Sequence, residues 1–188
     1  MLSFDSPPLS FLSVDGALEV GVESHSLSKG FDMIGWRMGW VCGNEHIVRA
    51  FSDVKDNTDS GQFIAIQKAA AEALDNDGIP RAVAEKYQRR LEKLVSMLTR
   101  CGIPARMPGG TYFLYTPSPK RVSGGLTFDS AEAASQYLIT EHSICTVPWD
   151  DAGPFLRFSV TYEAGDASQE DRLMAETESR LKEIAFEF

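Results

Sequence analysis

The sequence predicts a mixed fold, between α/β and α+β, in which helices are laid on a small sheet. Three observations support this prediction: long helical periodicities, short apolar segments between turn residues, and an ordinary globular composition. Of 188 residues, 43% are hydrophobic and 24% are charged, which excludes the bias of disordered or fibrous chains. A chain of this length buries one core, or a modest domain and a piece of another.

The clearest predicted helix starts near Pro80 and continues to Gly102. Proline suits the first turn of a helix, and the apolar positions that follow it repeat at helical spacing. These positions are Val83, Tyr87, Leu91, Leu94, Val95 and Leu98. Asn44 is a good N-cap for an earlier helix over residues 45–54, and an alanine-rich helix is expected over residues 62–74.

The remaining elements are shorter. Asp129 and Glu132 resemble a capping box that starts a helix through Ile139, and a final amphipathic helix is expected over residues 168–184. Strands are expected where β-branched and aromatic residues lie between turn residues. Their ranges are 18–23, 35–43, 111–115, 144–147 and 155–160.

Charge and cysteine usage narrow the classes of partner. The net charge of -9 argues against nucleic acid or an anionic membrane surface, since both need clustered basic residues. No apolar run approaches the roughly 20 residues that a membrane span needs. Cys42, Cys101 and Cys145 are too far apart for a zinc motif or a disulfide framework, and no signal peptide is visible. We therefore expect a cytoplasmic protein without a metal site.

A polar loop and the predicted strand that follows it contain the first candidate site. Ser26, Ser28 and Arg37 offer the hydroxyl and guanidinium donors that bind a phosphate. Lys29, in a partly desolvated pocket beside Arg37, would lose its proton readily and act as a nucleophile. The alternative is that Lys29 is a solvated turn residue and Arg37 a surface residue of the second strand.

A second candidate site lies in the segment Phe155-Leu156-Arg157-Phe158-Ser159-Val160. Arg157 is the one charged residue of an otherwise apolar predicted strand, and its fork-shaped guanidinium matches a carboxylate. The alternative is an edge-strand arginine that faces solvent. Gly110, in Met107-Pro108-Gly109-Gly110-Thr111, lies either in a pocket wall or in a simple turn before a strand.

The phrase SLSKGFDMIGWRMGW resembles the lysine motif of the class I and II aminotransferases, which are fold type I pyridoxal-phosphate enzymes. The resemblance is nearest to the branch of LL-diaminopimelate and aspartate aminotransferases, and it extends over almost the whole chain. It implies that Lys29 is the catalytic residue that forms the Schiff base with pyridoxal 5'-phosphate. It further implies that Ser26, Ser28 and Arg37 bind this cofactor, and that Arg157 and Gly110 contact the substrate.

The same resemblance implies an organisation for the chain. Residues 1–75 would be the C-terminal part of the cofactor-binding large domain, and residues 76–188 the small C-terminal α+β domain. The family's carboxylate on the pyridine nitrogen and its stacking ring would lie before residue 1, and neither Asp5 nor Asp15 replaces that carboxylate. The family also implies a homodimer, with residues near Asn57 to Gln62 reaching the partner's cofactor. We expect this chain to be inactive alone.

The expected activity of the full-length enzyme is transamination between an amino acid and a 2-oxo acid, with LL-diaminopimelate or aspartate as the amino acid. Two alternatives stay open. The chain could be a stand-alone, non-catalytic domain that keeps the fold, or it could serve another fold type I reaction such as that of a β-lyase or a decarboxylase. Arg157 favours transamination over decarboxylation, because it holds the carboxylate in place.

Overall fold

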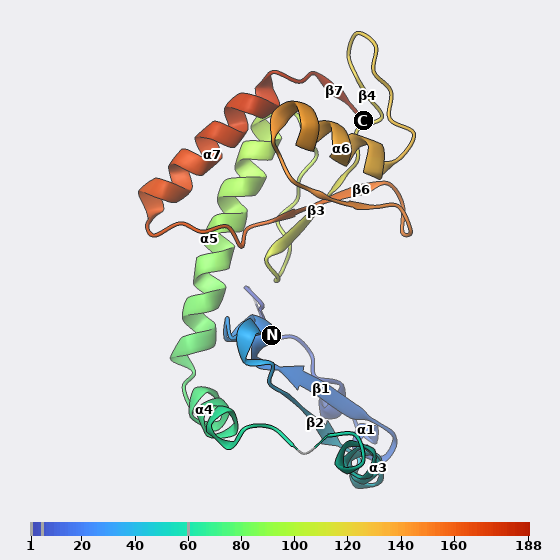
Figure 1. Ribbon diagram of the computed structural model, residues 1–188, viewed down its shortest axis with the longest axis vertical. Helices are drawn as coiled ribbons and strands as arrows, with labels where there is room; N and C mark the ends of the chain where they lie inside the picture. Colours follow the sequence, from blue (N-terminus) through green and yellow to red (C-terminus); the bar gives the residue numbers. More distant parts are fainter. Residues whose placement is uncertain (1, 5, 60) are drawn as a thin grey trace. The chain divides into compact units, whose positions relative to one another are not determined.

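The computed structural model describes residues 2–4, 6–59 and 61–188, which form two compact units, Met1–Glu85 and Lys86–Phe188 (Figure 1). Asp5 and Ser60, two residues in the segments that carry the family resemblance, lie outside the described residues. The two units divide within the long helix α5 (Gly78–Arg100). The domain boundary between residues 75 and 76 stays a prediction.

The first unit is built around an antiparallel hairpin. Strand β1 pairs with β2 from Val22 opposite Gly43 to Ser26 opposite Gly39. The elements of this unit are η1 (Phe11–Ser13), α1 (Ala17–Val20), β1 (Val22–Ser26), α2 (Leu27–Gly30), η2 (Ile34–Trp36), β2 (Gly39–Gly43), α3 (Glu45–Asp56) and α4 (Ile64–Leu74). The predicted N-cap of α3 is confirmed, because the Asn44 side chain accepts hydrogen bonds from the backbone N–H groups of His46 and Ile47.

Two strand predictions in this unit were partly wrong. Residues 17–20 form a helical turn, so the first strand begins only at Val22. The second strand begins at Gly39, because the five residues of β1 pair only with residues 39–43 and leave the preceding segment without a partner strand. That segment closes instead into the short helix η2. Among the described residues, no helix combines the length and the apolar character needed to cross a bilayer.

The second unit is an α+β arrangement, as the sequence predicts. With most of α5, it contains β3 (Phe113–Pro117), β4 (Arg121–Val122), α6 (Ala131–His142), β5 (Val147–Trp149), β6 (Phe155–Ser159), α7 (Ala167–Lys182) and β7 (Phe186–Glu187). Strands β3, β6 and β5 form an antiparallel sheet in that order, and α5 and α7 lie side by side (Figure 1). The buried core draws on α5, α6, α7 and one face of the sheet, through Leu91, Leu94, Leu98, Leu114, Leu138, Leu156, Phe158 and Leu181.

Local chemistry explains where this unit departs from the prediction. Ser130, and not Asp129, caps α6, since its side chain accepts a hydrogen bond from the Ala133 N–H. Strand β3 starts two residues late, because Thr111 has a φ of 77°, outside the extended region. The two-residue pair β4–β7 was not predicted, because so short a pair leaves no periodicity in the sequence.

Candidate functional site

The loop that joins β1 to β2 brings together the predicted cofactor residues. Ser26 ends β1 and caps α2, where its hydroxyl accepts a hydrogen bond from the Ser28 N–H at 3.0 Å. Lys29 follows within the single turn of α2, and the Leu27 N–H donates to the Met38 carbonyl across the loop at 3.2 Å. Ser26, Ser28 and Lys29 therefore share one turn, which opens directly from the hairpin.

Arg37 does not lie in a strand, contrary to the prediction. It follows η2 with a φ of 54°, in the left-handed region that non-glycine residues rarely adopt. Its guanidinium donates to the Ile34 carbonyl at 2.8 Å, and no carboxylate of the described residues pairs with it. Strained backbone of this kind is often found at functional sites, and Asp32, in the same loop, has a φ of 56°.

The side chains of Lys29 and Arg37 are both exposed. The partly desolvated pocket that we expected around Lys29 is therefore not formed by the described residues alone. The activation of Lys29 by desolvation requires a cover over this loop that these residues do not supply.

A pocket of about 540 Å³ opens beside this loop, within the first unit. Arg37 lines it together with residues of β1, β2, α3 and the segment after α3. Lys55 and Asp59, also in its lining, form an ion pair at 2.5 Å, and this contact lowers the pKa of Asp59. Two donors, the Lys55 ammonium and the Gly61 N–H, bond to the same oxygen of Asp59, Oδ1, and no ion pair among the described residues joins this carboxylate to Arg37.

The donors of the loop fit the phosphate of pyridoxal phosphate in kind. The Ser26 hydroxyl donates only a long 3.5 Å contact to the Met38 carbonyl, so its proton is available to a better acceptor. The backbone also approaches closely here, because a Cβ added at Gly39 would lie 2.6 Å from the His25 carbonyl oxygen. Two hydroxyls and a guanidinium on a glycine-bounded loop are the groups that bind a phosphate.

Arg157 lies on the central strand of the second unit's sheet, and not on an edge. It stands opposite Tyr115 of β3 and Val147 of β5, on the sheet face away from the buried Leu156 and Phe158. The alternative of an edge-strand arginine is therefore wrong. Arg157 is half-buried, so its guanidinium is partly withdrawn from water yet open to a ligand.

Aromatic rings surround the Arg157 guanidinium. Its central carbon lies 4.3 Å from the centre of the Phe113 ring and 5.9 Å from that of Trp149. Trp149 meets Tyr115 edge to face at 5.9 Å. No described carboxylate pairs with Arg157, and cation–π contacts hold the guanidinium without using its N–H donors. A carboxylate ligand would therefore find these donors available.

Gly110 lies in the segment before β3 and is half-buried. The next residue, Thr111, has a β-branched side chain in the left-handed region at φ 77°, a strained arrangement. Gly110 and Arg157 belong to the second unit, while the lysine loop belongs to the first.

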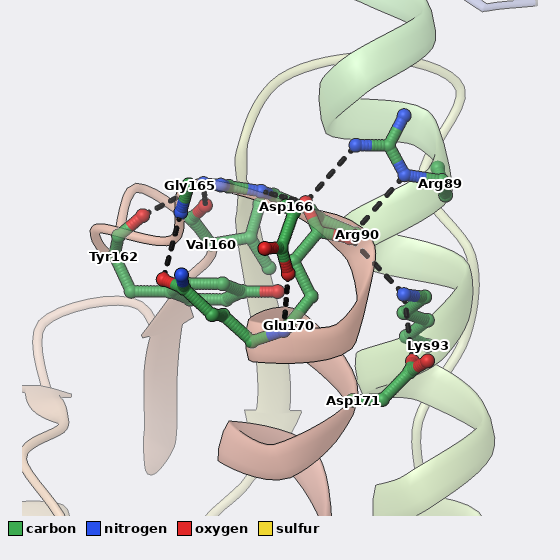
Figure 2. Close-up of polar contacts among 10 residues, drawn as sticks. Arg89, Arg90, Lys93, Val160, Tyr162, Gly165, Asp166, Glu170 and Asp171 are labelled. Carbon is green, nitrogen blue, oxygen red and sulfur yellow. Dashed lines mark hydrogen bonds and ion pairs between the residues drawn. The ribbon is translucent and has the colours of Figure 1, made fainter.

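A buried ionic cluster supports the end of the Arg157 strand (Figure 2). The Glu170 carboxylate of α7 accepts from three cations of α5: Arg90 at 2.8 Å, Arg89 at 3.0 Å and Lys93 at 3.1 Å. Arg90 also donates to the carbonyls of Val160 and Tyr162, at 3.0 and 2.8 Å, in the chain that directly follows β6. The cluster thus ties α5 and α7 to the strand that carries Arg157.

The centre of this cluster is shielded from water, whereas the side chains of Arg89 and Lys93 at its edge are 49% and 24% exposed. Arg90 is 4% exposed and Glu170 is 2% exposed. Hydrogen bonds from Arg89, and then from Arg90 and Lys93, lower the pKa of Glu170 to about 2. Sequence reasoning missed both residues, although each breaks an apolar helical stripe: Arg90 lies three residues after Tyr87, and Glu170 four residues before Met174.

A family match and two similar relatives point to the same protein family. The pattern of the family described as "Aminotransferase class I and II" matches residues 4–174. The LL-diaminopimelate aminotransferases of Methanococcus maripaludis and Methanocaldococcus jannaschii are each 50% identical to the chain over its full length. The chain spans 46% of each of these relatives, which is about half of their length.

Solved structures share the fold. The substrate-bound BacF structure from Bacillus subtilis superposes with a TM-score of 0.85 at 28% identity, covering 99% of this chain and 46% of that one. An aminotransferase from Staphylococcus aureus gives a TM-score of 0.80 at 25% identity, covering 96% of this chain and 46% of that one. The predicted fold type I framework is therefore confirmed, and the family depends on pyridoxal phosphate. The chain belongs to the class I and II aminotransferases.

Proposed function

We propose that this chain provides the lysine and carboxylate-binding part of an enzyme that transfers an amino group from an amino acid to a 2-oxo acid. One observation carries the proposal above the others: Lys29 shares one short loop with two serine hydroxyls and with Arg37, which has no described acidic partner. The 50% identity to LL-diaminopimelate aminotransferases supports LL-diaminopimelate as the amino acid.

In this proposal, each residue has a separate task. Ser26, Ser28 and Arg37 bind the cofactor phosphate through hydroxyl and guanidinium donors. Lys29 would hold the cofactor through its side-chain amine and would move a proton at the substrate α-carbon. Bound pyridoxal phosphate supplies an electron sink for that carbon. Arg157 holds the α-carboxylate, with Gly110 beside the substrate.

We also propose that residues 1–75 complete a cofactor domain in a cytoplasmic homodimer, with residues 76–188 as the small domain. The apolar side of helix α3 is exposed in this chain, which supports the proposal that another polypeptide segment covers it. Its apolar residues Ile47, Phe51 and Val54 are 40%, 51% and 67% exposed, which is unusual for one stripe of an amphipathic helix.

The test is to join the chain to the N-terminal half of the Methanococcus maripaludis relative and to measure transamination. With pyridoxal phosphate, LL-diaminopimelate and a 2-oxo acid, the joined protein should turn over, while the chain alone should not. The exposure of Lys29 and Arg37 is the reason to expect no activity from the chain alone. A folded joined protein without turnover on any amino acid would favour the non-catalytic alternative, and product analysis would reveal a β-lyase or a decarboxylase.

Substitution of Arg157 by glutamine should weaken substrate binding in the joined protein. Loss of charged hydrogen bonds costs about 1.5–3 kcal/mol, so KM for the amino acid should rise roughly 10- to 100-fold. Arg172→Gln, at an exposed position of α7, is the matched control and should leave KM unchanged. An unaltered KM in Arg157→Gln would remove this residue from the substrate site.

A further inference from the structure

Three metal-binding side chains gather on one face of the β1–β2 hairpin. Glu23 and His25 are two residues apart on β1 and therefore point to the same face. Cys42 of β2 lies directly opposite Glu23 in the antiparallel register and shares that face. One ligand atom from each of the three residues lies within 4.8 Å of the other two. Sequence reasoning missed this cluster because Cys42 is distant from the other two residues along the chain.

Neighbouring groups hold two of these side chains in a fixed orientation. One oxygen of the Glu23 carboxylate accepts from the Ser10 hydroxyl at 2.7 Å and from the Leu12 N–H at 3.3 Å. The other oxygen lies 3.0 Å from Nε2 of His25. The His25 ring stacks on Trp40, with ring centres 5.3 Å apart and planes inclined by 14°. Such outer contacts are what orient the ligands of metal sites.

The ligand atoms of this cluster favour a divalent ion that is intermediate between hard and soft. Thiolate, imidazole and carboxylate together suit Zn²⁺, whereas Mg²⁺ and Ca²⁺ prefer oxygen ligands alone. Zinc bonds of about 2.0–2.3 Å place tetrahedral ligands roughly 3.5 Å apart, so small side-chain rotations would close the present spacing. Cys42 is a free, half-buried thiol, and the side chains of His25 and Glu23 are 38% and 18% exposed, so solvent reaches the cluster.

We propose that Glu23, His25 and Cys42 bind one Zn²⁺ ion, with water as the fourth ligand. The Cys42 thiol and Nε2 of His25, which donates to Glu23 in this structure, each lose a proton to solvent as the zinc bonds form, and the neutral His25 ring that binds through Nε2 carries its remaining proton on Nδ1. The ion would link the two strands from which the Lys29 loop extends. This site involves none of the residues assigned above to the cofactor or the substrate.

The test uses the full 188-residue chain, free of any affinity tag, and Co²⁺ as a spectroscopic probe for Zn²⁺. One equivalent of Co²⁺ should produce a thiolate charge-transfer band in the near ultraviolet, and Zn²⁺ should displace it. Cys42→Ser should abolish this band, and His25→Phe, which keeps a ring to stack on Trp40, should weaken binding more than about 100-fold. Ser10→Ala should weaken binding about 10-fold, as loss of a supporting hydrogen bond does.

The exposed Cys145 provides the matched control, since Cys145→Ser should leave the band and the affinity unchanged. The proposal fails if the wild-type chain gives no band, if Cys42→Ser retains it, or if Cys145→Ser loses it. If Cys42→Ser changes the far-ultraviolet circular dichroism spectrum, this variant has lost its fold. The Co²⁺ affinities of Glu23→Gln and His25→Phe then decide the question. Wild-type affinity in both of these variants would overturn the site.

Discussion

Substitution of Lys29 by alanine is expected to abolish transamination by the joined protein described above. Lys29 is proposed both to bond to the cofactor and to move the proton at the substrate α-carbon. General acid–base catalysis alone contributes about 10²- to 10⁴-fold, so kcat should fall by at least that range. Steady-state assay of the amino-group transfer measures the loss, and borohydride reduction followed by peptide mapping should find the cofactor on Lys29 in the parent protein.

Lys68→Ala is the control for this experiment, because Lys68 is an exposed lysine on α4 of the same unit. It should retain full turnover and the same reduced adduct. Retained turnover in Lys29→Ala, or an adduct at another lysine in the parent, would show that the assignment of Lys29 is wrong. Methylamine added to Lys29→Ala should restore part of the rate if the missing group is an amine.

Substitution of Glu170 by alanine should cost about 3–5 kcal/mol of the stability of the second unit, the largest structural effect that we expect. It removes one partner of a buried ionic cluster and leaves Arg90, at 4% exposure, without its carboxylate. Hydrogen exchange resolved to β6 and α7 would measure this loss in the second unit itself, in the full chain. Protection factors should fall most at β6, which Arg90 supports through Val160.

The pH dependence of stability provides a second measure of the same cluster. The folded-state pKa of Glu170, about 2, lies below its ordinary value of 4.5. A depressed carboxyl pKa stabilises the folded state above the ordinary pKa, and this stabilisation is lost as the pH falls from about 4.5 towards 2. The shift corresponds to about 3 kcal/mol, which the wild-type chain should lose over this range and Glu170→Ala should not.

The comparison variant is Glu176→Ala, on the same helix. Its carboxylate pairs with Arg180 at 2.9 Å, but the Glu176 side chain is 62% exposed. Exposed pairs contribute at most about 1 kcal/mol, so this substitution should scarcely change exchange at β6. Equal effects of the two substitutions would show that burial of the Glu170 cluster adds nothing to its strength.

Local signals in the sequence were sufficient for most of the helices. The apolar repeat from Tyr87 to Leu98 and the cap at Asn44 are properties of consecutive residues, and both predictions hold in the structure. Strand limits were less accurate, because pairing decides where a strand begins. Residues 35–38 belong to the predicted strand, yet β1 ends before it could pair with them.

The same contrast between local sequence signals and long-range contacts applies to the candidate site. The sequence by itself determined the family, placed Ser26, Ser28 and Lys29 in one loop and placed Arg157 on a strand, because each depends on short-range order. It placed Arg37 on the following strand, which was wrong. Only the tertiary structure showed that the Arg37 backbone is left-handed and that two aromatic rings lie against the Arg157 guanidinium. It also showed that Glu170 pairs with Arg90 and that Cys42 lies near Glu23 and His25, which are distant in the chain. Such contacts depend on which elements pack together, and burial and pairing decide this only once the chain has folded.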